Sequence, residues 1–202
     1  GIEAVIWTDA IQSVVLTVGA AVVVVLVLTG MPEGAGQAIR LADDAGKFSL
    51  GDFGPSLATS TFWVILMYGV IMNLTNFGID QNFVQRYHAA ESDKAAGHSV
   101  WFGSLVYIPV ALMFFFIGSI LFSYGEANPE FLAEVKLEMV AADSPGLAKS
   151  SAEAMRLAGE LEPSDYGDKV LPHFIANKIP AGLAGLLIAA LFAAAMSSID
   201  TS

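Results

Sequence analysis

The sequence predicts an all-α membrane protein, and two observations carry this prediction. Hydrophobic residues make up 55% of the 202 residues and charged residues only 14%, well below the roughly 25% that is typical of soluble domains. The charges are also unevenly distributed, because long charge-free stretches lie between residues 9 and 33, 52 and 80, 94 and 126, and 178 and 200. Each stretch is long enough for a membrane-spanning helix of about 20 residues.

We therefore expect four membrane spans, at residues 5–29, 56–78, 99–124 and 180–202. The first span is rich in Val and ends at Gly30-Met31-Pro32, a typical stop signal for a helix. The third contains Pro109, a candidate kink. The last span closes on Ser, Asp and Thr residues, so we expect the chain to be an internal fragment of a longer protein.

Three connections join these spans. Residues 30–55 and 80–98 are expected to be polar connections, and residues 125–169 to form a long acidic loop. Within that loop, residues 129–140 and 145–161 show helical, amphipathic patterns, which predict a structured surface excursion.

The charges of the connections orient the spans only weakly. Lys and Arg number two in residues 30–55, two in residues 80–98 and five after the third span, so the positive-inside rule gives nearly a tie. Only the brevity of the 80–98 connection, with Arg86 and Lys94, favours a cytoplasmic position. The net charge of −11 lies mostly in the connections and argues against nucleic acid or anionic lipid head groups as partners.

A first group of polar residues stands at the start of the first span. Asp9, Gln12 and Ser13 are spaced i, i+3 and i+4, so they share one helix face. An Asp at the centre of a span costs about 2.5–3.5 kcal/mol. Two interpretations stay open: a ligand for a cation, or an interfacial charge that the helix macrodipole stabilises.

A second polar stripe lies at the end of the second span. Asn73, Asn76 and Asp80 are spaced i, i+3 and i+7. Amides within a span commonly hydrogen-bond to a neighbouring helix, and the alternative is a surface that lines a substrate cavity. Gly69 and Gly78 are candidate points for a bend, as in the broken helices of transporters.

The most informative polar group closes the fourth span. Ala194, Ser197, Ser198 and Thr201 form a stripe of small and hydroxyl residues, with Asp200 beside it. Small residues promote close helix packing, but packing does not account for a carboxylate between hydroxyls. Oxygen atoms are the ligands of hard cations, and a carboxylate in a membrane needs a cation or a proton.

Other chemistry finds little support in the sequence. A Gly-rich phosphate loop and a His-Glu-x-x-His motif are both absent, and His88, His98 and His173 are expected in separate connections. We therefore expect neither an enzyme, nor a cofactor, nor a metal other than sodium. The absence of Cys excludes disulfides and thiolate sites.

Three blocks of the sequence resemble the sodium/solute symporter family, which includes sodium-coupled sugar, proline, sialic acid and vitamin transporters. They are Ala4-Val5-Ile6-Trp7-Thr8-Asp9-Ala10-Ile11-Gln12, then Asn76-Phe77-Gly78-Ile79-Asp80-Gln81 through Val84-Gln85-Arg86-Tyr87, and Gly182-Leu183 through Ala194-Ala195-Met196-Ser197-Ser198. The resemblance covers nearly the whole chain.

The resemblance implies a multi-pass protein of the cell membrane that couples sodium influx to uptake of a small organic solute, such as a sugar or an organic acid, by alternating access. It implies the leucine-transporter-like fold of two inverted five-helix repeats, with these spans as core helices five to eight. It also places residues 80–98 in the cytoplasm and the acidic loops outside. A sodium- or solute-responsive sensor, or a channel-like protein on the same fold, is the alternative.

The resemblance also assigns sodium ligands. The common sodium site of the family corresponds to the carbonyl of Ala194 and the hydroxyls of Ser197 and Ser198, with further ligands from a helix outside this chain. A second sodium site of some members falls on Asp9, Ser197, Asp200 and Thr201. Asp200 stands where that site has Ser, so a more anionic or a proton-linked site is expected here.

For the solute, the resemblance gives Asn73, Asn76, Phe77 and Tyr107 as lining residues. Asn73 matches an Asn that contacts the substrate in the sugar transporters. Asn76 replaces their gating Tyr, and Tyr107 replaces their sugar-binding Lys. These two departures argue against glucose or galactose as the solute.

Overall fold

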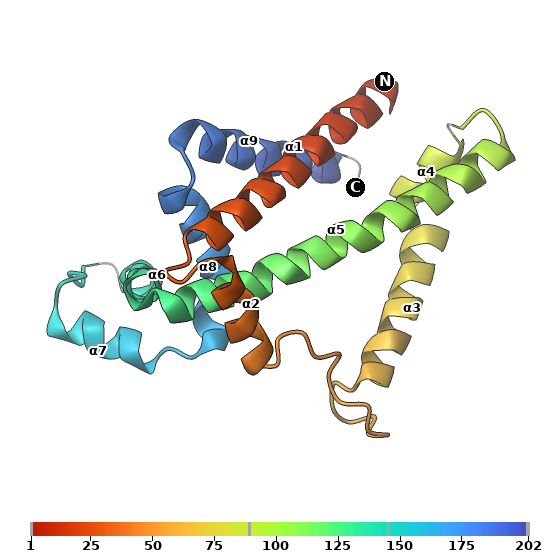
Figure 1. Cartoon of the computed structure of the whole chain (residues 1–202). Helices are drawn as coiled ribbons and strands as arrows, with labels where there is room; N and C mark the ends of the chain where they lie inside the picture. Colours follow the sequence, from red (N-terminus) through yellow and green to blue (C-terminus); the bar gives the residue numbers. More distant parts are fainter. Residues whose placement is uncertain (1, 89, 145, 201–202) are drawn as a thin grey trace. The chain divides into compact units, whose positions relative to one another are not determined.

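The computed structural model describes residues 2–88, 90–144 and 146–200, with side chains except those of residues 2–5, 82, 86 and 197–200. The regular structure of the described residues is entirely helical (Figure 1). The chain divides into two compact units, the first with residues up to 47 and 113–193, the second with residues 48–112 and from 194 onward.

The first unit is built from long apolar helices and shorter amphipathic ones. It contains α1 (Ile2–Thr29), α2 (Ala35–Asp44), the second half of α5 (Asp93–Ala127), α6 (Pro129–Asp143), α7 (Ala152–Glu160), α8 (Pro163–Lys178) and most of α9 (Ala181–Asp200). The second unit contains α3 (Phe62–Gly78), α4 (Gln81–His88), the first half of α5 and the end of α9.

Aliphatic and aromatic side chains from distant parts of the sequence form the core of the first unit. Val27 of α1, Ile120 of α5 and Phe174 of α8 are almost completely buried. The Tyr124 ring meets the rings of Phe131 and Phe174 edge to face, with centroids 5.1 and 5.3 Å apart, the geometry that aromatic pairs prefer. This core holds α6 and α8 against the end of α5.

Two close contacts bring further helices to this core. A Cβ at Gly19 of α1 would lie 2.9 Å from Cγ of Leu187 on α9 and closer still to its Cδ2, so only glycine permits this approach. The buried hydroxyl of Ser123 on α5 donates to the carbonyl of Ala38 on α2 at 2.7 Å. Residues 30–55, expected as a polar connection, thus contain a packed helix.

The acidic loop is helical over more of its length than the sequence pattern predicts. The prediction for residues 129–140 corresponds to α6, but the prediction for residues 145–161 was too long, because α7 begins only after Ser151, whose Oγ caps it by accepting from the Ala154 N–H at 3.1 Å. The helix α8 was not predicted. Its start is fixed by Pro163 and by the Glu162 N–H, which donates to Asp165 at 2.8 Å.

In the second unit, α3 begins six residues later than the expected span at 56–78. Thr61 sets this boundary, because its buried side chain accepts from the Val64 N–H and donates to the Ser56 carbonyl at 3.1 Å. Residues 80–98, expected as a short polar connection, contain α4 and the start of α5.

Within the described residues, two helices are long and apolar enough to cross a membrane, Ile6–Thr29 in α1 and Asp93–Ala127, which is α5. Phe62–Gly78 and Ala181–Met196 are apolar but shorter. The 17 residues of α3 are about 26 Å long at 1.5 Å per residue, slightly less than the roughly 30 Å of a bilayer core. That all four helices cross the membrane stays a prediction.

Candidate functional site

The second unit contains a groove of about 820 Å³ that α3 and α5 line together. Most of its lining is apolar, from residues such as Leu66, Val70 and Val100, and the polar groups come from Asn73 and Ser104. An apolar pocket with few polar groups is the usual form of a small-molecule site.

Of the predicted lining residues, the structure places Asn73 and Phe77 on this groove. The Asn73 Nδ2 donates to the Gly69 carbonyl one turn earlier at 2.7 Å, which fixes the side chain along its own helix. The amide oxygen is then the acceptor that Asn73 offers to a ligand. Ser104 was missed by sequence reasoning, and its only signal was a hydroxyl inside an apolar span.

The structure does not bring the other two predicted residues to the groove. Asn76 is exposed on α3, and Tyr107 on α5 is 65% exposed. Neither belongs to the groove lining. Their contact with a solute stays a prediction.

Local contacts hold the end of α3 where Phe77 lies. The helix runs without a break through Gly69 and ends at Gly78, where the Thr75 carbonyl accepts from the N–H groups of both Ile79 and Asp80. The Tyr87 hydroxyl of α4 donates to the Phe77 carbonyl at 3.1 Å. Of the two candidate bends, Gly78 is therefore a helix end and Gly69 is not a bend.

On α1, hydroxyls follow Asp9 along one face. The Ser13 hydroxyl donates to the Asp9 carbonyl at 2.8 Å, and the Thr17 hydroxyl donates to the Ser13 carbonyl at 2.7 Å. Each hydroxyl uses its hydrogen within the helix, so its oxygen lone pairs are left to accept a hydrogen bond or to coordinate a cation. Asp9 and Gln12 are half-buried on this helix.

The predicted sodium ligands of α9 are described only in part. The helix continues through Ala194, which is half-buried, to Asp200. The side chains of Ser197, Ser198 and Asp200, and all of Thr201, lie outside the described residues. Both sodium sites therefore stay predictions.

The histidines are placed differently from what the sequence indicated. His88 ends α4, His98 lies within α5, and His173 is buried within α8 rather than in an irregular loop. Among the described residues there is no group of three His, Asp or Glu side chains arranged to hold a metal ion.

The described residues combine long apolar helices, an apolar groove and a row of hydroxyls bonded within α1, and these features are compatible with a helical membrane protein. The model of the Sodium:solute symporter family matches residues 1–202, and the chain belongs to that family. Members of this family are integral membrane proteins. The resemblance read from the three sequence blocks is thereby confirmed.

Individual relatives agree with this assignment. The chain is 30% identical to the sodium/sialic acid symporter of Aliivibrio fischeri and 30% identical to that of Proteus mirabilis, over its full length in both cases. It spans 34% and 35% of the lengths of these relatives, so it corresponds to about a third of such a protein.

A solved structure confirms the fold class. It is described as the substrate-bound, outward-open state of a Na⁺-coupled sialic acid symporter with a novel Na⁺ site. The similarity covers 100% of this chain and 37% of that one, with a TM-score of 0.76 and 31% sequence identity. The chain is therefore a segment of a leucine-transporter-like helical bundle.

Proposed function

We propose that the protein containing this segment is a secondary active transporter of the cell membrane, which couples sodium influx to the uptake of a small organic solute by alternating access. The family match over the whole chain is the main support. No covalent chemistry and no cofactor are part of the proposal. The relatives are named as symporters, which favours transport over a sensor or a channel.

The proposed common sodium site uses the Ala194 carbonyl and the hydroxyls of Ser197 and Ser198. Sodium takes oxygen ligands, as other hard cations do, and a ligand that prefers one conformation shifts the population toward it. Sodium bound here would favour the outward-open state and so prepare the solute site.

The proposed second sodium site uses Asp9, Ser197, Asp200 and Thr201. The half-buried position of Asp9 on an apolar helix supports it, because a carboxylate in a membrane requires a cation or a proton. For the solute, we propose contact with Asn73, Asn76, Phe77 and Tyr107. The groove lined by Asn73 and Phe77 supports this assignment for two of the four.

Uptake by the full-length protein in proteoliposomes tests the coupling. Sialic acid is the first solute to try, because both bacterial relatives are named for it, followed by other sugars and organic acids. We expect accumulation above the external concentration only with an inward sodium gradient. Accumulation that is unaffected by replacing sodium with potassium contradicts the proposal, and mere equilibration favours a channel.

Two substitutions test the sodium sites. Ser198→Ala removes a ligand to a charged ion, which is worth about 1.5–3 kcal/mol, so the sodium concentration for half-maximal uptake should rise at least tenfold. Ser119→Ala is the matched control, because its hydroxyl donates within its own helix at 3.0 Å.

Asp9→Asn tests the second sodium site. It should change the number of sodium ions transported per solute, and unchanged coupling would remove Asp9 from the proposed site.

A further inference from the structure

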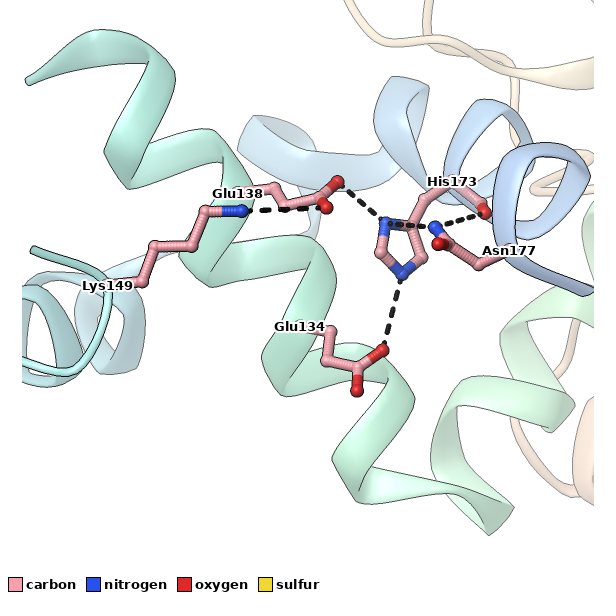
Figure 2. A network of polar contacts seen from close by, with 5 residues as sticks. All are labelled: Glu134, Glu138, Lys149, His173 and Asn177. Carbon is pink, nitrogen blue, oxygen red and sulfur yellow. Dashed lines mark hydrogen bonds and ion pairs between the residues drawn. The ribbon is translucent and has the colours of Figure 1, made fainter. Parts of the chain in front are cut away.

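His173 lies where α8 meets α6, with one carboxylate at each of its ring nitrogens (Figure 2). Its side chain is only 5% exposed. Nδ1 is 2.8 Å from Oε2 of Glu138, and Nε2 is 3.6 Å from Oε2 of Glu134. The two glutamates stand four residues apart on α6, so they present their carboxylates from one helix face.

The two nitrogens differ in how well their hydrogen bonding is satisfied. A distance of 2.8 Å to an ionised carboxylate requires a hydrogen on Nδ1, and a neutral ring has only one hydrogen to place. Nε2 would then direct a lone pair at the Glu134 carboxylate. In the part of the chain that the structure describes, Nε2 is the buried side-chain polar atom that lacks a hydrogen-bond partner, and such an atom destabilises the fold.

The surrounding groups keep Glu138 ionised. The hydrogen bond from His173 is the main reason that the pKa of Glu138 lies below its ordinary value, and Lys149, 3.6 Å from Oε1, acts in the same direction. On α8, the Asn177 Nδ2 donates to the His173 carbonyl at 3.0 Å and also lies 3.3 Å from His173 Nδ1, which is closer to Glu138. The Phe131 ring packs edge to face on the imidazole. The charges that face the ring are therefore two acids from α6.

We propose that His173 is a proton-binding site, and that the doubly protonated ring clamps α8 to α6 by donating to Glu138 through Nδ1 and to Glu134 through Nε2. The second proton supplies the donor that Nε2 lacks, and the 3.6 Å separation shortens to a hydrogen bond. Acid favours binding of the second proton to the ring, so the clamp is stronger at low pH and weakens as the pH rises.

Glu134→Gln in the full-length protein tests this proposal, because a carboxylate at position 134 favours the doubly protonated ring, whereas an amide favours the neutral ring. A Gln amide donates a hydrogen bond to the neutral Nε2, whereas a carboxylate only accepts one. Relative to wild type, we expect the melting temperature of Glu134→Gln to be about 2–4 °C lower at about pH 5.5 and equal or higher at about pH 8. The measurement is made in sodium-free buffer, so its outcome is independent of whether the protein transports anything.

Two controls isolate the His173–Glu134 pair. Glu130→Gln, an exposed position in the first turn of α6, should shift the melting temperature equally at both pH values. With His173→Gln as background, Glu134→Gln should lose its pH dependence. A Glu134→Gln effect of the same sign and size at both pH values overturns the proposal, because it would show a packing role without a proton.

Discussion

The two halves of α5 differ in how far other helices bury them. All the buried residues of this helix lie between Ile117 and Gly125, in the half that belongs to the first unit. The half in the second unit exposes Trp101, Phe102 and Tyr107, and α3 in the same unit has no buried residue at all. The side chains of the first unit pack against one another and stabilise it. The second unit presents apolar surface that requires lipid or further helices as neighbours.

This difference separates stability from function. Polar groups of the first unit, such as Ser123 and His173, are engaged across helices. The Asn73 side chain of the second unit bonds within its own helix and lines a groove. Substitutions at the contacts between helices of the first unit should therefore change the melting temperature, and substitutions in the groove of the second unit should change transport.

The largest expected effect is that of Phe174→Ala. Phe174 is 1% exposed in the core of the first unit, and removing a buried Phe typically costs about 3–5 kcal/mol. Thermal unfolding of the purified full-length protein measures it. The control is Met155→Ala, at a 57% exposed position on α7, which should change little. A similar loss for both variants would mean that this core does not stabilise the protein.

Gly19→Ala should come next. The added Cβ meets Leu187, and overpacking of this kind costs about 1–3 kcal/mol. Gly36→Ala in α2 is the matched control, because its Cβ would meet nothing within 4 Å and alanine favours a helix by roughly 0.5–1 kcal/mol. Opposite signs in thermal unfolding are the expected result, and equal signs would contradict the close contact between α1 and α9.

These packing contacts show how far the sequence could predict the structure. Charge-free stretches indicated the apolar helices, because burial in lipid excludes charges over a whole helix length. The sequence of α8 predicts a helix only weakly, because Gly167 and Pro172 interrupt the helical pattern of its residues. The bond between His173 and Glu138 joins residues 35 positions apart, and no local pattern encodes such a pair.

The candidate site, like the fold, could be predicted from the sequence only in part. The spacing of Asn73 and its neighbours on one helix face predicted a polar stripe, and the structure places Asn73 on a groove. Ser104 reaches that groove from a different helix. Its contribution depends on the position of α5 relative to α3, which spacing along one helix cannot reveal.

Asn73→Ala tests the second unit. Loss of one hydrogen bond to a solute is worth about 0.5–1.5 kcal/mol, so the KM for solute should rise by up to about tenfold. The melting temperature should stay within error of wild type, because the Asn73 side chain bonds only to its own helix. Gln85→Ala on the exposed side of α4 is the control. A lower melting temperature with unchanged KM would assign Asn73 to packing instead.

The smallest expected effect is the pH dependence of the Glu138 contribution. The hydrogen bond from His173 lowers the pKa of Glu138 in the folded protein, so the unfolded chain takes up a proton at a higher pH than the folded one. The stabilisation is therefore complete above the unfolded pKa of about 4.3 and is lost as the pH falls through the lower folded pKa. Because the side chain is 50% exposed, solvent screening holds the contribution below about 1 kcal/mol.

Thermal unfolding of wild type and Glu138→Gln over a pH series measures this contribution. Gln keeps the shape of the side chain and removes the charge, so the difference between the two proteins should shrink toward zero as the pH falls below the pKa of the unfolded glutamate, about 4.3. Glu160→Gln is a suitable reference, since Glu160 pairs with Arg156 in an exposed i, i+4 arrangement. A difference that kept growing below the unfolded pKa of about 4.3 would mean that Glu138 is protonated, and not ionised, when it holds α6 to α8.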